Sequence, residues 1–211
     1  MPPSFRPALA AVPAAVSAAL LAALLPDAAF AQSLPARSKP FRVKLGGSFF
    51  DNGVDAPPVY LPDPMASSQR IPYLFSAGVA CDFSRARALT PNVYADFSTG
   101  SEPGTATATN ADIGVAVRFV PTGGHPGTGH PFAEAGIGYY GTRLKIVGYI
   151  GGDETKTGAN PGAKAALGYE WRGGVFGEFE YTFVRRFTRG YRNGDATYNP
   201  SGLKANLGYR F

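Results

Sequence analysis

Apolar and polar residues alternate one by one in segment after segment between residue 41 and residue 211. In the clearest segment, 175–183, Phe179, Tyr181 and Phe183 alternate with Glu178 and Glu180. Successive side chains of a β-strand point to opposite faces of the sheet. A period of two therefore predicts strands with one apolar face and one polar face.

Eight such segments occur, which predicts an all-β, eight-stranded antiparallel up-and-down barrel. We expect strands at residues 41–49, 71–83, 93–98, 112–119, 133–140, 163–171, 175–183 and 203–211. These lengths approach the roughly ten residues of a tilted membrane strand. Long connections are expected at 51–70, 143–160 and 186–200, and the shortest at 172–174. The turns expected on the opposite side at 84–90 and 120–131 are also long, whereas the loop near 100–110 is modest. A ninth and tenth strand within one of the connections is the alternative.

The polar face carries glycine and charged residues of both signs, whereas the apolar face carries no charged residue. A soluble barrel also alternates, but its apolar side points inward. Glycine weakens a strand unless a close approach requires it, and it recurs on the polar face at Gly46, Gly78, Gly114, Gly136, Gly138, Gly168 and Gly208. Aromatic residues of the apolar face gather near segment ends, as in the girdles of membrane barrels. We therefore predict a transmembrane barrel with its polar face inside.

The polar face holds six cations and seven anions, which we expect to form ion pairs inside the barrel because buried charges are normally paired. They are Arg42, Lys44, Arg118, Lys164, Lys204 and Arg210, with Asp82, Asp96, Asp112, Glu134, Glu170, Glu178 and Glu180. The interior of an eight-stranded barrel is just wide enough for side chains to fill. Long charged side chains thus predict a closed lumen.

The first 31 residues have the pattern of an export signal. Arg6 precedes a charge-free stretch rich in Ala and Leu, and Ala29-Phe30-Ala31 matches a signal-peptidase site. The alternative is an uncleaved anchor, since about twenty apolar residues can cross a bilayer. We expect a signal peptide at 1–31, a periplasmic segment at 32–40 and a barrel domain at 41–211. This organisation predicts the outer membrane of a Gram-negative bacterium.

Net charge and cysteine content limit the binding partners and the covalent crosslinks that we expect. The net charge is +5, but no run of Lys and Arg typical of nucleic-acid binding occurs, so no nucleic acid is expected. Cys81 is the only cysteine, so no intramolecular disulfide can form. We expect a monomer that contacts outer-membrane lipid and lipopolysaccharide.

The ending Gly208-Tyr209-Arg210-Phe211 resembles the assembly signal of outer-membrane barrels. Together with the export signal and the eight segments, it makes the chain similar to the small outer-membrane barrels of the OmpX and OmpA membrane-domain type. The resemblance implies that the barrel-assembly machinery reads the last strand through Tyr209 and Phe211. It implies an architecture and no particular activity, because this fold hosts several functions.

Catalysis, metal binding and cofactor binding are not expected. The two histidines, His125 and His130, lie in a Gly- and Pro-rich segment that reads as a turn on the periplasmic side. Small barrels that modify lipid A use an outward-facing His and Ser, and this segment is on the wrong side for that chemistry. Two histidines without neighbouring Cys or carboxylate ligands also make a weak metal site.

Two carboxylates, Glu178 and Glu180, lie two residues apart on one face and could do acid–base chemistry. The plainer interpretation is an ion pair with Arg42, Lys44 or Arg210, whose strands lie near the closure of the barrel.

The last long connection is rich in arginine, at Arg185, Arg186, Arg189 and Arg192. Guanidinium groups suit phosphate, which predicts a contact with lipopolysaccharide; a solvated loop without a ligand is the alternative. The sequence as a whole favours a non-enzymatic outer-membrane barrel with surface loops for structural, protective or binding roles. A narrow channel or lateral conduit for small or hydrophobic molecules is the second hypothesis, and a lipid A-modifying enzyme is the third.

Overall fold

The computed structural model describes residues 39–48, 53–55, 68–71, 74–83, 89–102, 106–121, 129–147, 152–191 and 194–211. The predicted signal peptide and most of the segment that follows it lie outside these residues. Within the described residues, no helix has the length and apolar character needed to cross a bilayer.

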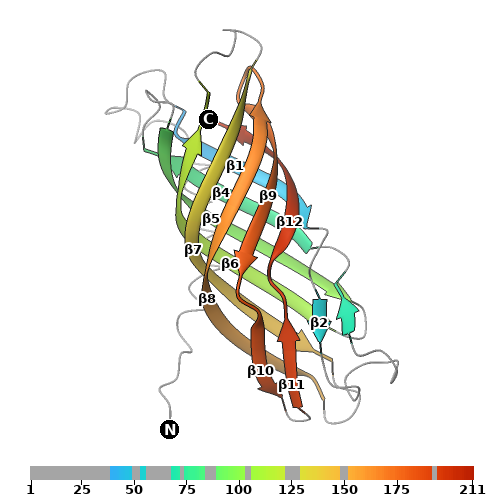
Figure 1. The fold of residues 1–211 in the computed structure, drawn as a ribbon. Coiled ribbons are helices and arrows are strands. Elements are labelled where there is room, and N and C mark those ends of the chain that lie inside the picture. Colours follow the sequence, from blue (N-terminus) through green and yellow to red (C-terminus); the bar gives the residue numbers. More distant parts are fainter. Residues whose placement is uncertain are drawn as a thin grey trace, which may run out of the picture.

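Eight strands form a closed antiparallel barrel (Figure 1). They are β1 (Phe41–Ser48), β4 (Leu74–Asp82), β5 (Leu89–Glu102), β6 (Ala106–Phe119), β7 (His130–Ile146), β8 (Glu154–Glu170), β9 (Val175–Val184) and β12 (Gly202–Arg210). Each strand pairs with its neighbour in barrel order, and β1 pairs with β12 to close the ring. Two hydrogen bonds extend this seam, because the Phe41 and Phe211 amides each donate to the other residue's carbonyl, at 3.1 and 3.0 Å. The predicted fold class is confirmed.

Four short strands form a second sheet outside the barrel. They are β2 (Gly53–Asp55), β3 (Ser68–Arg70), β10 (Phe187–Tyr191) and β11 (Gly194–Tyr198), in the order β10-β11-β2-β3. In Figure 1, β2, β10 and β11 lie at the end of the barrel opposite the C-terminus. The barrel therefore keeps eight strands, and the extra strands belong to the connections 51–70 and 186–200.

Several predicted boundaries were wrong, because β5 to β8 extend well beyond the apolar segments. The connection predicted at 143–160 is mostly strand, since β7 continues to Ile146 and β8 begins at Glu154. The pairing between Arg143 and Thr157 belongs to this extension. Where a strand leaves the apolar environment, its outward face becomes polar as well, and the alternation that marks a strand disappears. The prediction also began β4 too early, because Ile71 is not in a strand.

The outward face of the barrel is apolar, as predicted. Its exposed large side chains, which we call the apolar belt, are Leu45, Phe75, Phe83, Leu89, Val93, Ile113, Val115, Val117, Phe119, Ile137, Tyr139, Leu167, Trp171, Val175, Phe179, Phe183, Leu207 and Tyr209. A soluble protein rarely leaves such a contiguous apolar surface in water. Polar interior and apolar exterior together are the arrangement of a transmembrane barrel.

A short turn joins β8 to β9 through Arg172, Gly173 and Gly174. Both glycines have φ of +97°, which side chains rarely adopt. The Trp171 amide donates to the Val175 carbonyl at 2.8 Å and closes the hairpin. This short turn lies at the same end as the C-terminus, where membrane barrels have their periplasmic turns.

Candidate functional site

The thirteen charged residues predicted for the barrel interior all have side chains inside the lumen. Lys44 is the most exposed of them, with 12% of its side-chain surface accessible, and the other twelve residues are buried. Their contacts divide into a group of arginines near the periplasmic end and a group of lysines in the middle of the barrel.

In the periplasmic group, arginines and carboxylates bridge across strands. The Arg42 guanidinium lies 3.1 Å from Asp82 and 2.8 Å from Glu134. Arg210 lies 3.1 Å from Asp82 and 3.3 Å from Glu170. Both arginines therefore hold two carboxylates each, which crosslinks strands that are not adjacent in the barrel.

Arg118 is held differently, between two aromatic rings. Its guanidinium carbon lies 3.4 Å from the centre of the Phe132 ring and 5.7 Å from that of Phe176. Its Nη2 donates to Glu170 at 2.9 Å, while Nε and Nη1 have no hydrogen-bond partner among the described residues. Cation–π attraction to the rings thus replaces part of the solvation that the buried guanidinium has lost.

Interior glycines make room for this aromatic pair. A Cβ atom at Gly168 would overlap the Phe132 ring, and one at Gly208 would overlap the Phe176 ring. The glycine-rich polar face noted in the sequence therefore accommodates large side chains from other strands. Phe132 was not assigned to a face from the sequence, although its distance of two residues from Glu134 on one strand placed it there.

In the middle group, Glu180 is the common partner of three lysines. Its carboxylate oxygens lie 2.6 Å from Lys44, 3.3 Å from Lys164 and 3.3 Å from Lys204. Glu178 contacts Lys44 at 3.0 Å and accepts a hydrogen bond from the Asn206 amide at 3.2 Å. The two glutamates thus share Lys44, whereas Arg42 and Arg210, the other partners considered for them, hold Asp82.

Three further anions contact these lysines, and one of them, Glu134, lies 3.4 Å from Lys164 and so joins this group to the arginine group. Asp96 lies 3.3 Å from Lys44 and 3.4 Å from Lys164, and Asp112 lies 3.5 Å from Lys204. The carboxylates of this group are thus buried and bound to lysines, as expected for interior ion pairs.

A tyrosine pair fills the lumen beside the lysines. The hydroxyls of Tyr94 and Tyr140 lie 3.1 Å apart, and Lys164 sits 3.6 Å from the centre of the Tyr94 ring. Cβ atoms at Gly114 and Gly138 would collide with the Tyr94 hydroxyl. A void of about 10 Å³ borders this region, lined by residues that include Arg42, Lys44, Tyr94, Asp96, Glu134 and Lys164. That volume holds about one water molecule.

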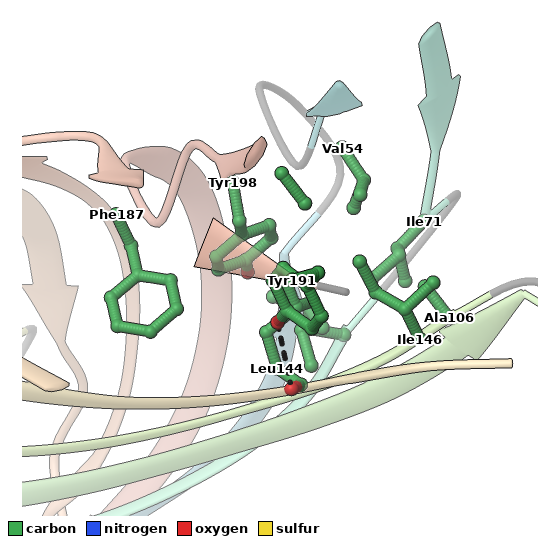
Figure 2. Close-up of a cluster of buried hydrophobic side chains, with 11 residues drawn as sticks. Val54, Ile71, Ala106, Leu144, Ile146, Phe187, Tyr191 and Tyr198 are labelled. Atoms are coloured by element: carbon green, nitrogen blue, oxygen red, sulfur yellow. Dashed lines mark hydrogen bonds between the residues drawn. The ribbon is translucent and has the colours of Figure 1, made fainter. Parts of the chain in front are cut away.

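An apolar cluster joins side chains of the second sheet to side chains of the barrel strands (Figure 2). The cluster consists of Val54, Ile71, Leu74, Ala106, Ala108, Leu144, Ile146, Phe187, Tyr191, Ala196 and Tyr198. We call the second sheet and this cluster the outer cap. Phe187 and Tyr191 come from β10, and Tyr198 comes from β11. Tyr191 and Tyr198 contact the extended strands β7 and β6, whereas Phe187 lies against Gly158 on β8.

Hydrogen bonds fix the outer cap to the barrel wall. The Tyr191 hydroxyl donates to the Leu144 carbonyl at 3.2 Å, as the dashed line in Figure 2 shows. The Asn110 amide donates to the Tyr198 hydroxyl at 3.1 Å, and burial raises the pKa of Tyr198 to about 12. Sequence analysis missed the cap, although the two-residue spacing of Ala196 and Tyr198 was a signal for a short strand.

The four arginines of the last connection do not form one cluster. Arg185 and Arg186 are exposed between β9 and β10. Arg189 stacks on Phe187, with 4.9 Å between the guanidinium carbon and the ring centre, and donates to the Thr188 carbonyl at 2.9 Å. Arg192 lies outside the described residues.

Of the two histidines, only His130 lies in the described part of the chain. His130 begins β7 at the periplasmic end, 3.9 Å from Glu170, and His125 lies outside the described residues. No group of three or more His, Cys, Asp or Glu side chains in the described part is arranged to hold a metal ion.

The C-terminal aromatics line the outside of the closure seam. The rings of Tyr209 and Phe211 stack with 6.2 Å between their centres, and Phe211 stacks on Phe41 at 6.4 Å. This places both residues of the predicted assembly signal at the periplasmic end of the barrel.

No protein-family model matches this chain, and no curated protein matches it. Solved structures with a similar fold include Neisserial surface protein A, which is 15% identical, with a TM-score of 0.44 over 82% of this chain and 98% of that one. The N-terminal β-barrel domain of Pseudomonas aeruginosa OprF is 10% identical, with a TM-score of 0.46 over 82% and 98% of the two chains. Ail, the attachment invasion locus protein of Yersinia pestis, is 12% identical, with a TM-score of 0.40 over 82% and 100%. These likenesses concern the fold alone.

Proposed function

We propose that this chain is a non-enzymatic barrel of a bacterial outer membrane, with a closed lumen and a folded outer cap that acts at the cell surface. One observation carries the proposal: inside an apolar exterior, the lumen is filled by paired charges and aromatic rings. Such a barrel holds its outer end at the surface and carries nothing through the membrane. Its role is then structural, protective or one of binding at that surface.

Side chains fill the lumen at three positions along the barrel, which supports a closed barrel over a channel or lateral conduit. Arg118 lies between Phe132 and Phe176 near the periplasmic end, Glu180 joins its lysines in the middle, and the apolar cluster joins the second sheet to the barrel strands. A permeating molecule would have to break all three, and buried ion pairs resist opening because a charge without its partner is costly in a low-dielectric interior.

The position of His130 supports a non-enzymatic role. It lies at the end of the barrel that carries the C-terminus and the β8–β9 turn, far along β7 from the outer extension that ends at Ile146. Lipid chemistry on the outer leaflet would need a base near that extension, within hydrogen-bond reach of its nucleophile.

Conductance measurements test the closed lumen. We expect the full chain, inserted in a planar bilayer, to show no conductance above the bare bilayer. We expect the same of a variant in which 186–200 is replaced by a short Gly/Ser linker, because the charged groups beneath the outer cap still fill the lumen.

Heat-modifiable migration on gels would verify that both proteins are folded barrels. Stable conductance steps from the folded full chain would contradict the proposal. Steps that appear only after removal of 186–200 would show that the outer cap, and not the ion-paired interior, closes the barrel.

A further inference from the structure

On each of five neighbouring strands, the outward face changes from apolar to polar toward the outer end of the barrel. On the outward face of β5 to β9, the last apolar side chains are Phe97, Ala111, Tyr139, Ala159 and Phe183. The first polar side chains beyond them are Thr99, Thr109, Arg143, Thr157 and Arg185. In a transmembrane barrel, this change marks the level at which lipid tails give way to headgroups.

Three arginines lie just beyond this boundary: Arg143 on β7, and Arg185 and Arg186 after β9. All three are exposed, and we call them the basic rim. No carboxylate of the described residues pairs with any of them, whereas the nearby Lys145 is held by Asp153 at 2.6 Å. Among the described residues, the basic rim therefore presents guanidinium groups without a carboxylate partner just beyond the end of the apolar belt.

We propose that the basic rim binds the phosphate groups of lipopolysaccharide in the outer leaflet. This inference rests on the proposed outer-membrane location and orientation. A guanidinium group offers two parallel N–H donors that match phosphate oxygens. A lipid whose tails lie against the apolar belt brings its phosphates to the level of these donors, so charge and geometry favour the same occupant.

Hydroxyl groups beside Arg143 suit the sugar part of the same lipid. Thr109 and Thr157 stand directly opposite Arg143 on the two neighbouring strands. Thr99 and Thr109 are hydrogen bonded to each other at 3.2 Å, which makes the strip next to the arginine polar without adding charge. A phosphorylated glycolipid needs this combination of cation and hydroxyl donors.

Arg189 is not part of the basic rim, which distinguishes this site from a general arginine-rich loop. Its guanidinium lies over Phe187 and beside Gly158 on the inner side of the extended wall. Arg172 is also exposed, but it lies in the β8–β9 turn at the other end of the barrel. These two arginines, with Lys156, which lies 5.6 Å from the Tyr191 ring, supply a charge-matched control.

The experiment is native mass spectrometry of the purified full chain released from mixed micelles that contain lipopolysaccharide. The test variant is R143S/R185S/R186S, and the control is K156S/R172S/R189S, which removes the same charge away from the rim. Each arginine near an anionic lipid surface contributes a separate favourable interaction, so we expect the test variant to need about tenfold or more lipopolysaccharide for equal occupancy. The control should stay within about twofold of wild type.

Dephosphorylated lipopolysaccharide provides a second measurement that needs no variant. We expect wild type to bind it about as weakly as the test variant binds the native lipid. Equal binding of native and dephosphorylated lipid by wild type would overturn the proposal, as would equal binding by the two triple variants. If either of these results were obtained with a protein that is still a folded, non-conducting barrel, the proposed lipopolysaccharide site would be wrong. The proposed function as a closed barrel would not be affected.

Discussion

Replacement of Glu180 by glutamine should lower the free energy of unfolding by about 3–5 kcal/mol, the cost of removing one partner from a buried ion pair. Glu180 is 1% exposed and contacts Lys44, Lys164 and Lys204. The variant keeps the shape of the side chain but leaves three ammonium groups with one negative charge fewer. Urea unfolding of the purified protein in detergent micelles, followed by tyrosine and tryptophan fluorescence, measures the change.

The outer surface offers a matched control for this prediction. Lys145 and Asp153 are 2.6 Å apart, the same distance as Lys44 and Glu180, but their side chains are 45% and 44% exposed. Exposed pairs contribute about 0–1 kcal/mol, so Asp153→Asn should have a small effect. Equal losses for the two variants would mean that water screens the interior pair, and the lumen would then be hydrated and not closed.

The alternation of residues predicted the barrel because the membrane imposes it. Where lipid lies outside the barrel and packed polar groups lie inside, outward-facing residues must be apolar and inward-facing residues are mostly polar. Beyond the apolar belt this constraint ends. The sequences of the outer parts of β5 to β8 therefore lack the alternation of a strand, although these parts continue the strand pairing of the barrel. Thr99 opposite Thr109 is an example, because neither face there requires an apolar residue.

The interior charges were predictable one at a time, but their partners were not. The alternation in each segment assigns Glu178, Glu180 and Lys204 to the polar face. Which of these charges meet across the lumen depends on the closed barrel. Lys164 reaches Asp96, which lies 68 positions away in the chain. Such contacts depend on barrel diameter and strand tilt, which no single segment encodes.

The outer cap was not predicted from the sequence, for a different reason. It joins β2 and β3 from one connection to β10 and β11 from another, and β2 has only three residues. β2 and β3 have too few residues to show a period, and the pairing of β2 with β11 joins distant parts of the chain. Val54, opposite Tyr198, shows that the cap depends on contacts that only the closed barrel can bring together.

Introduction of arginine at Val93 should cost about 2–4 kcal/mol in a lipid bilayer, whereas arginine at Ser101 on the same face of β5 should cost about 0–1 kcal/mol. Val93 lies midway along the apolar stretch from Leu89 to Phe97, and Ser101 lies beyond the boundary at Thr99. The eight-residue spacing keeps both side chains outward. Unfolding by urea in lipid vesicles measures both changes.

This pair of variants tests which side of the barrel meets lipid. In a barrel with lipid outside, the guanidinium at position 93 must leave water for hydrocarbon, whereas the one at position 101 stays among headgroups. If the outward face were in water, both variants would have equally small effects, and arginine at position 93 would raise solubility by covering an exposed apolar patch. A depth-dependent cost is therefore the expected signature of an apolar belt in lipid, because no other environment distinguishes two outward positions on one strand in this way.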